Sequence, residues 1–459
     1  MKIPRFSFTL TAVLLAAALT ACSDDEPAGA PAADRADASP DTSGDASAGD
    51  ATTALPIDGG ASDIVVDDND AAAADAQGAP TTLASAGIAI LSGDRKSTAL
   101  SLLALDGTSL AMDQCFHSGS QAPQLSAALS GDVVLPSAPQ PNNEIALIDR
   151  KNGTITWLSP ATCAVLRQMN VGPGFASNPF DLVGGLPGGK GYVARYNTDP
   201  GNPAIGSDLL IISTDKAAAT GRIDLRAYAP AVTPPSSPLL PDPTRFATAA
   251  GKVYVLLNNL SADYNAAGIG RLVTIDPATD AVVGTIDLPG LQNCGALQAL
   301  AGATGDVLVV GCAGPFSAGP AQIDSAGVAW IDLAQSPPAV TVVKATAFGR
   351  PVSGFDVGVQ DPALAFTVVS GDFGMPPSDA VWAFDFQGGA PRKIYESDSS
   401  FSLSLTLDRD RRRLFVLDAG MAAPRVHIFA LPIGGAPAEA AALVSNPTAG
   451  LPPRVLALY

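Results

Sequence analysis

The chain contains only two histidines, His117 and His427, which limits the acid–base chemistry that its sequence can suggest. A Ser-His-Asp arrangement needs a histidine within hydrogen-bond reach of a serine and a carboxylate. We expect His117 in a loop and His427 within a strand, so a triad would have to be assembled from segments far apart in the sequence. The sequence therefore indicates no catalytic residues. We expect one exposed histidine and one packed between strands.

A glycine-rich segment and an arginine cluster are the other chemically suggestive groups. The segment Gly184 to Gly189 lacks the Lys-Ser/Thr pair of a phosphate-binding loop and the spacing of a dinucleotide-binding fold, so we interpret it as a tight turn. The cluster Arg409 to Arg413 includes an aspartate and belongs to a net acidic chain. We interpret it as a solvated turn and expect no nucleic-acid binding.

The N-terminal residues have the order of a bacterial export signal. Lys2 and Arg5 precede an apolar run that closes with Leu19-Thr20-Ala21-Cys22, a motif that resembles a lipobox. We expect residues 1–21 to be a lipoprotein signal peptide and Cys22 to be the lipidated first mature residue. An ordinary secretory signal with a chance cysteine is the alternative. No other segment is apolar over the length needed to span a bilayer.

Lipid attachment at Cys22 predicts a protein anchored in the cell envelope through its acyl chains. By resemblance to lipoprotein sorting signals, Ser23 at the second mature position favours the outer membrane, because an aspartate at this position often retains a lipoprotein at the inner membrane. The sequence does not indicate which side of that membrane the protein occupies.

The segment after Cys22 is rich in Ala, Asp, Ser, Gly, Thr and Pro and has no aromatic residue before Pro80. It buries too little apolar surface to offset the entropy of ordering, so we expect residues 22–80 to form a disordered linker. This linker supplies most of the net charge of −18, and its self-repulsion favours an extended tether. The aspartates lack the Gly-centred spacing of a calcium-binding loop, which makes a solvated spacer the preferred interpretation.

One structural unit recurs between residues 83 and 459. The clearest copy has a strand at Val253–Leu257, a second at Arg271–Asp276 and a third at Val282–Leu288, separated by polar loops and an Asp-Pro-Ala-Thr-Asp turn. This pattern resembles the YVTN-type (YncE-like) β-propeller repeat. The resemblance implies an all-β propeller of four-stranded antiparallel blades. It covers the repeat frame only and includes no motif of a binding site.

Seven segments match the third strand of such a unit, and seven units of this size fit the length of the chain. The segments are Ala99–Asp106, Thr154–Thr162, Leu209–Asp215, Arg271–Asp276, Val328–Asp332, Val381–Asp385 and Val426–Ala430. The first unit lacks an innermost strand, whereas Leu451–Tyr459 is a spare strand at the other end. We therefore predict that the C-terminal strand completes the first blade and closes the ring. A fraying terminal strand in a two-domain β protein is the alternative.

Four cysteines remain besides Cys22, and the export signal places them in an oxidising compartment. Cys294 and Cys312 bracket an innermost strand and its neighbour, and we predict that they pair. Cys115 and Cys163 belong to the first and second units, where a bridge between blades is plausible. No pair has the close spacing of a zinc site, so we expect no metal at these residues.

Loops between second and third strands open on the same face as the connections between blades, and we call this the loop face. The long loops are predicted there: Pro136–Asn143, Tyr196–Ser207, Asn258–Ile269, Gly311–Gly327, Gly371–Asp379 and Gly420–Arg425. Binding residues concentrate on loops held by a rigid scaffold. The candidate ligand-binding residues are Arg195, Tyr196, Asn197, Asn258, Asn259, Asp263, Tyr264, Asp372, Phe373 and Asp418.

Three functions suit this architecture. The preferred one is a monomeric envelope module that binds a protein, glycan or other envelope ligand with its loop face, without a cofactor. The second is a Ca²⁺-dependent hydrolase that resembles the lactonase and gluconolactonase propellers, with Asn258, Asn259, Asp372 and Asp418 as an approximate ligand set. Only four glutamates occur in the chain, none at an obvious channel position. A quinone-dependent dehydrogenase ranks last, because its regular tryptophan repeats are missing.

Overall fold

The computed structural model describes residues 86–459, except 108, 173, 231–237, 303–304, 317–319, 372–376, 401 and 421–423. The described residues belong to one compact unit. The expected signal peptide, Cys22 and the acidic linker lie outside the described residues, and so do Asp372 and Phe373. The corresponding expectations stay predictions.

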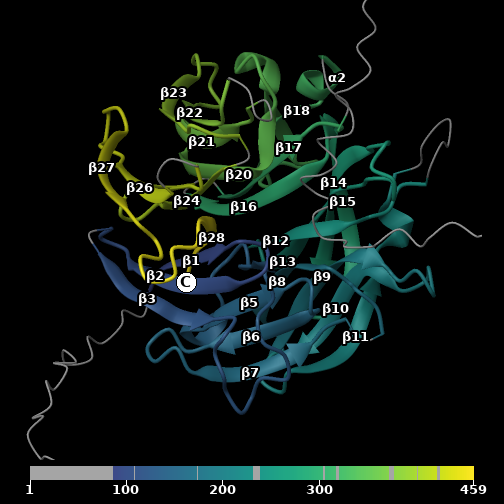
Figure 1. Ribbon diagram of the computed structural model, residues 1–459. Coiled ribbons are helices and arrows are strands. Elements are labelled where there is room, and N and C mark those ends of the chain that lie inside the picture. The colour runs from purple at the N-terminus through teal and green to yellow at the C-terminus, as the bar shows by residue number, and fades with distance from the viewer. Residues whose placement is uncertain are drawn as a thin grey trace, which may run out of the picture. The chain divides into compact units, whose positions relative to one another are not determined.

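Seven four-stranded antiparallel sheets, the blades, follow one another around a ring (Figure 1), which confirms the predicted seven-bladed β-propeller. In blades 2 to 7 the strands run outward in sequence order, whereas the first blade has the order β28, β1, β2, β3. The innermost strands of blades 1 to 7 are β28 (Pro453–Leu458), β4 (Val133–Val134), β8 (Pro179–Leu186), β12 (Pro243–Ala249), β16 (Cys294–Gly302), β20 (Val352–Asp361) and β24 (Leu403–Asp408). The second strands are β1 (Gly87–Gly93), β5 (Ile145–Asp149), β9 (Lys190–Thr198), β13 (Lys252–Leu257), β17 (Gly305–Ala313), β21 (Leu364–Val369) and β25 (Arg413–Asp418).

All seven segments predicted as third strands form the third strands of their blades. These strands are β2 (Thr98–Ala104), β6 (Thr154–Leu158), β10 (Gly206–Ser213), β14 (Ile269–Asp276), β18 (Ala326–Asp332), β22 (Ala380–Phe384) and β26 (Arg425–Ala430). The outermost strands are β3 (Leu110–His117), β7 (Val165–Asn170), β11 (Ala218–Asp224), β15 (Ala281–Gln292), β19 (Ala339–Lys344), β23 (Arg392–Glu396) and β27 (Ala438–Leu443). His117 ends β3, so the expectation that it lies in a loop was wrong.

Helical turns in the described residues are short. Three are 3-10 turns, η1 (Pro141–Asn143), η2 (Arg226–Tyr228) and η3 (Ala345–Ala347), and one is a short α-helix, α2 (Pro320–Asp324). None of the helices in this part of the chain has the length and apolar character required to cross a bilayer.

The core consists of layers between neighbouring blades. Second strands such as β1 are buried along their whole length, whereas the outermost strand β11 is mostly exposed. An inner strand needs apolar side chains on both faces because a blade packs on each side of it, which explains the continuous apolar runs in the sequence. The buried apolar residues form seven clusters, one for each pair of adjacent blades.

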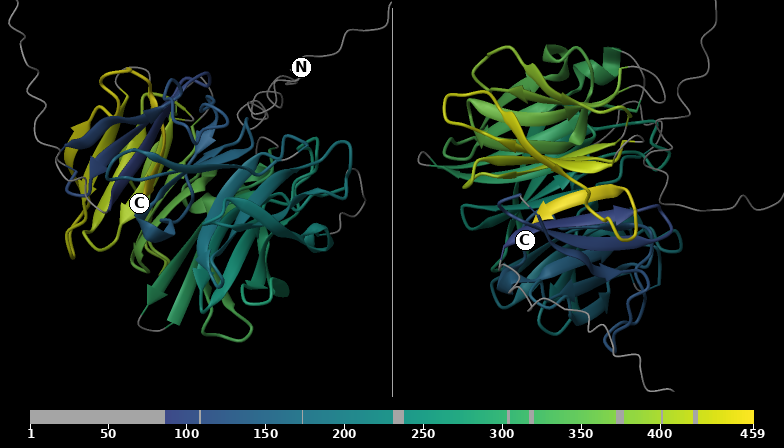
Figure 2. Two further views of the ribbon diagram at one scale, coloured as in Figure 1. Left: turned by 90° about the horizontal axis from the view of Figure 1, so that it is seen from below. Right: turned by 60° about the vertical axis from the view of Figure 1, so that its left-hand side comes forward.

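The C-terminal strand closes the ring, as predicted. β28 pairs antiparallel with β1, with Leu458 opposite Ile88 and Leu456 opposite Ile90. The right-hand view of Figure 2 shows this last strand lying against the strands of the first blade. The ring of Tyr459 packs over Gly87, where a Cβ atom would lie 2.5 Å from the phenol oxygen. The glycine leaves room for this ring, and the first and last blades share a common apolar layer.

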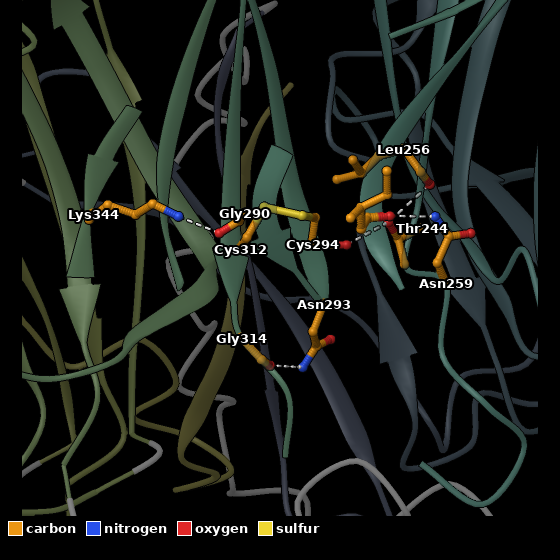
Figure 3. The surroundings of a disulfide bond; sticks show 10 residues. Thr244, Leu256, Asn259, Gly290, Asn293, Cys294, Cys312, Gly314 and Lys344 are labelled. Atoms are coloured by element: carbon orange, nitrogen blue, oxygen red, sulfur yellow. Dashed lines mark hydrogen bonds between the residues drawn. A yellow bond between two sulfur atoms is a disulfide. The ribbon is translucent and has the colours of Figure 1, made fainter. Parts of the chain in front are cut away.

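The two predicted disulfides are present. Cys294 on β16 pairs with Cys312 on β17 inside blade 5, and both residues are buried. Figure 3 shows this bridge beside Asn293, whose amide donates a hydrogen bond to the Gly314 carbonyl at 3.0 Å. Cys115 on β3 pairs with Cys163 in the turn after β6, so this bridge joins blades 1 and 2. One bridge reinforces a single blade, and the other ties two blades together.

The loop face carries the connections at residues 94–97, 150–153, 199–205, 258–268, 314–325, 370–379 and 419–424. The prediction for Pro136–Asn143 was wrong. This segment connects β4 to β5, an innermost strand to its neighbour, and such turns open on the opposite face. The error arose because β4 is only two residues long and leaves almost no strand signal in the sequence.

Candidate functional site

The candidate residues of blades 3 and 4 lie at the ends of two neighbouring second strands. Arg195, Tyr196 and Asn197 are in the last part of β9, and Asn258 and Asn259 follow directly after β13. Asp263 and Tyr264 are farther along the loop of residues 258–268. Asp418, by contrast, ends β25 in blade 7. The structure therefore brings one group of candidates together and places Asp418 in a separate setting.

Arg195 forms a buried ion pair. Its Nε and Nη2 atoms each donate a hydrogen bond of 2.7 Å to the carboxylate of Asp208 on the adjacent strand β10. Arg222 on β11 donates a third bond of 2.9 Å to the same carboxylate. The guanidinium of Arg195 also lies 5.5 Å from the centre of the Phe175 ring. These contacts occupy Arg195 within blade 3 and hold the loop-face end of this blade together.

Tyr196 is 5% exposed and belongs to the apolar layer between blades 3 and 4. Its ring packs on Phe180 with the ring centres 5.3 Å apart. Burial raises the pKa of its hydroxyl well above the usual value, and the carboxylate of Asp242 acts in the same direction. The structure thus places Tyr196 in the core beneath the loop face, with its hydroxyl close to Asp242.

Four buried polar residues meet at this point, and we call them the Asp242 cluster: Tyr196, Ser207, Asp242 and Asn258. The backbone N–H of Asp242 donates to the hydroxyl of Ser207 at 2.9 Å, and that hydroxyl lies 3.4 Å from the Asp242 carboxylate. The backbone N–H of Asn258 donates to the Asp242 carbonyl at 3.0 Å. Burial raises the pKa of Asp242 well above its ordinary value.

A repeated backbone turn positions Asp242. The residues before the innermost strands of blades 3, 4 and 5 are Asn178, Asp242 and Asn293, and all three have positive φ angles. Asparagine and aspartate tolerate this conformation better than other non-glycine residues. Their backbone carbonyls accept hydrogen bonds from the ends of the second strands, at Tyr196, Asn258 and Ala313. This turn therefore places an Asp or Asn at the loop-face end of each of these blades.

The other candidates differ in exposure: Asp263 is exposed, Asn197 and Tyr264 are half-buried, and Asn259 is fully buried. Asp263 is exposed and accepts hydrogen bonds from Ser261 at 2.6 Å and Asn265 at 3.0 Å. Tyr264 contacts Phe316, in the next loop of the same face, edge to face with ring centres 6.0 Å apart. Asn197 donates to the Ala176 carbonyl at 3.1 Å, and Asn259 donates to the Ile269 carbonyl at 2.9 Å. Phe316 was not among the predicted residues, because its contact depends on two loops from different blades.

A second polar network joins blades 6 and 7. The Asp418 carboxylate accepts hydrogen bonds from the Tyr395 hydroxyl at 2.6 Å and the Ser397 hydroxyl at 2.8 Å. The Tyr395 oxygen lies 2.9 Å from Nε2 of His427, whose Nδ1 lies 2.7 Å from Glu439. Burial raises the pKa of Tyr395, and its bond to Asp418 adds to this shift. His427 is half-buried between strands, as expected, but the sequence did not indicate this network.

The innermost strands hold a third set of charges. Nη1 of Arg245 donates to the Phe180 carbonyl at 3.2 Å. The guanidinium groups of Arg245 and Arg150 lie 5.4 and 5.5 Å from the centre of the same Phe180 ring. Burial lowers the pKa of Arg245, while the carboxylates of Asp181 and Asp356 oppose this shift. The positive charge of Arg245 is therefore offset by the carboxylates of Asp181 and Asp356 on other innermost strands.

The two carboxylates also connect adjacent blades. Asp181 accepts from the backbone N–H of Phe246 at 2.8 Å, and Asp356 from that of Leu405 at 3.2 Å. A cavity of about 80 Å³ lies near Arg150 and is lined in part by Asp132, Ser92 and Arg454. It is large enough for water molecules, but far smaller than typical organic-ligand pockets of roughly 300–1,000 Å³.

The ligand set proposed for a Ca²⁺-dependent hydrolase is not assembled in the described residues. Asn258 and Asn259 belong to blade 4, whereas Asp418 is bound by Tyr395 and Ser397 next to blade 7. Asp372 lies outside the described residues. Within the part of the chain that the structure covers, no three His, Cys, Asp or Glu residues form a group that could hold a metal ion.

No family model and no curated protein matches this chain. Solved structures do resemble it. A hypothetical selenium-binding protein from Sulfolobus tokodaii is 9% identical, with a TM-score of 0.51 over 77% of this chain and 89% of that one. An inactive virginiamycin B lyase from Staphylococcus aureus with quinupristin is 12% identical, with a TM-score of 0.45 over 73% and 92%. A protein from Lactobacillus plantarum is 13% identical, with a TM-score of 0.48 over 81% and 98%. Only the first of these similarities has a TM-score above 0.5, and it supports the fold alone.

Proposed function

We propose that this protein is a lipid-anchored component of the bacterial cell envelope whose propeller binds a protein, glycan or other envelope ligand through its loop face. The lipobox-like sequence ending in Cys22 and the acidic segment after it support the anchor and the tether. The long loops of blades 3 to 5 support the choice of face. In this arrangement the tether holds the propeller away from the membrane.

The contact between Tyr264 and Phe316 is the observation that carries the proposal. It joins the loops of blades 4 and 5 on the loop face, and both rings are only partly buried. Aromatic side chains supply large contact areas at low entropic cost, and they are enriched in recognition surfaces. The carboxylate of Asp263, next to Tyr264 in sequence, is exposed and accepts hydrogen bonds from Ser261 and Asn265.

The polar networks elsewhere favour binding over catalysis. The carboxylates of Asp181, Asp208, Asp356 and Asp418 accept hydrogen bonds from neighbouring strands or blades. A general base needs a carboxylate or imidazole that faces a substrate. These four groups instead hold structural elements together, and so they do not favour a catalytic role.

Capture of ligands from a membrane extract tests the binding face. Residues 81–459 would be immobilised through the N-terminus, and material retained by the wild type would be compared with that retained by Tyr264→Ala and Phe316→Ala. We expect both variants to retain at least about tenfold less material, as for central aromatic contacts. Ile433→Ala is the control, since Ile433 is 87% exposed in a turn of the opposite face. Equal capture by all variants would contradict the proposed face.

The anchor has a separate test. Growth with a labelled fatty acid should label the wild-type protein, and Cys22→Ser should abolish both the label and recovery in the membrane fraction. An unlabelled wild-type protein recovered without membranes would contradict the anchor while leaving the binding face untouched.

A further inference from the structure

The carboxylate of Asp242 differs from the other buried carboxylates in its partners. Asp242 is 3% exposed, and its contacts are the Ser207 hydroxyl at 3.4 Å and the Leu260 backbone N–H. Asp208, in contrast, is paired with two arginines. No ion pair joins Asp242 to a lysine or arginine of the described residues. An ionised carboxylate in such a position is costly unless a cation neutralises it.

Neutral polar groups lie near this carboxylate. The Tyr196 hydroxyl and both amide atoms of Asn258 are buried and form no hydrogen bond of normal geometry to the described protein atoms, although the Asn258 amide is close enough to lower the pKa of that hydroxyl. Asn258 is 1% exposed. Most buried polar groups in proteins are hydrogen-bonded, so these three atoms near one buried carboxylate point to a bound species.

The chemical nature of these groups indicates which kind of ion the site would bind. The Asp242 cluster offers carboxylate, amide and hydroxyl oxygens and no imidazole or thiolate, a set that suits hard cations. Because there is only one carboxylate, a monovalent cation makes the site neutral. A divalent cation would leave a net buried charge, which is unfavourable in an apolar layer. A small ion also fits the burial of the site better than an organic ammonium group.

We propose that the Asp242 cluster binds a monovalent alkali cation, Na⁺ or K⁺, between blades 3 and 4 and beneath the loop of residues 258–268. The Asp242 carboxylate and the Asn258 amide oxygen are its ligands, and the hydroxyls of Tyr196 and Ser207 complete the oxygen set. The ion ties the loop-face ends of β9 and β13 to the start of β12. This site lies beneath the loop that carries Tyr264, and its test has a different readout from the capture experiment.

Thermal unfolding in different salts tests the site. The melting temperature of residues 81–459 would be measured in NaCl, KCl and choline chloride at equal ionic strength. We expect an increase of at least about 2 °C in one of the alkali salts relative to choline, since a ligand that binds only the folded state stabilises it. Asp242→Asn should abolish this increase, and the matched control Asp263→Asn, an exposed carboxylate of the same loop, should retain it.

Several outcomes would overturn the proposal. Equal melting temperatures in all three salts would mean that the buried Asp242 carboxyl is neutralised by a proton and not by an ion, and an increase that persists in Asp242→Asn would place the ion elsewhere. Stabilisation by added CaCl₂ that EGTA reverses, without a sodium or potassium effect, would replace the monovalent ion with a divalent one. Should Asp242→Asn fail to fold, Asn258→Ala tests the same ligand set. None of these results affects the capture experiment, which depends on Tyr264 and Phe316.

Discussion

The guanidinium of Arg195 and the carboxylate of Asp208 face each other across two adjacent strands of blade 3 and share two hydrogen bonds of 2.7 Å. Their side chains are 5% and 0% exposed. Arg195 therefore stabilises blade 3 through a buried ion pair. The sequence made it a candidate for ligand binding because it is a charged residue at the end of a strand.

This pair leads to a prediction about stability. Asp208→Asn leaves the buried Arg195 charge without its counter-ion, and we expect it to lower the free energy of unfolding by about 3–5 kcal/mol. Asp287→Asn is the matched control, because Asp287 pairs with Arg271 across β14 and β15 but is 43% exposed. Its effect should stay below about 1 kcal/mol. Urea unfolding measures both values. Similar losses of unfolding free energy in the two variants would contradict the view that the Arg195 pair stabilises the blade because it is buried.

Closure of the ring gives a second prediction. Leu456 on β28 is 6% exposed in the layer between the last and first blades. Leu456→Ala should destabilise the protein by about 2–4 kcal/mol, because it removes buried apolar surface and leaves a cavity. Leu166→Ala makes the same change at a side chain that is 42% exposed and should alter stability by less than about 0.5 kcal/mol. Thermal unfolding of the two variants would settle the comparison, and an unaffected Leu456 variant would mean that the ring does not depend on this strand.

The two disulfides should differ in their response to reductant. Cys294 and Cys312 are both fully buried, whereas Cys163 is partly exposed in a turn. A thiolate must reach a sulfur atom to cleave the bridge, so we expect dithiothreitol to reduce the bridge between Cys115 and Cys163 first under native conditions. Alkylation and peptide mass spectrometry at successive times would identify the order. Prior loss of the bridge within blade 5 would contradict the burial argument.

The contribution of each bridge depends on the length of the loop that it closes. The separations are 18 residues in blade 5 and 48 residues between blades 1 and 2. The loop-closure relation gives about 3 and about 4 kcal/mol respectively. Double Cys→Ala variants, compared by urea unfolding, should therefore both be destabilised, with the larger loss for the bridge between blades.

An exposed carboxylate provides the pH prediction. The Arg226 guanidinium hydrogen-bonded to Asp224 lowers the pKa of that carboxyl to about 2. Since the pKa is about 3.9 in the unfolded chain, the contribution to stability is present above pH 4 and is lost as the pH falls through 2. The two side chains are 39% and 44% exposed, so solvent screening keeps the effect below about 1 kcal/mol.

Asp224→Asn should therefore be slightly less stable than the wild type at pH 5 and equal to it near pH 2. Urea unfolding at both pH values measures this difference, and 0.5 M NaCl should reduce it at pH 5. A difference that increases as the pH falls would show that another group controls the acid response.

Much of the fold follows from local sequence patterns. The seven third strands were recognisable because apolar residues recur in short runs that end at Asp or at turn residues, a pattern set by strand geometry and turn chemistry. The unpaired strand at Leu451–Tyr459 indicated ring closure, and the Cys294–Cys312 pairing followed from the order of strands in a blade. The short strand β4 escaped detection, because two residues carry no periodicity, and with it the face of Pro136–Asn143 was misassigned.

The candidate site depended on contacts between distant segments. From the sequence alone, Tyr196 and Asn258 were polar residues at strand ends, and nothing near them in the chain identified Asp242 as their neighbour. The same is true of Tyr395, Asp418 and His427, and of Tyr264 with Phe316. Periodicity reports which side of a strand is buried, and so the sequence by itself determined the blades and their order. Which polar groups share a buried space is decided by the packing of one blade against the next, and only the tertiary structure shows that.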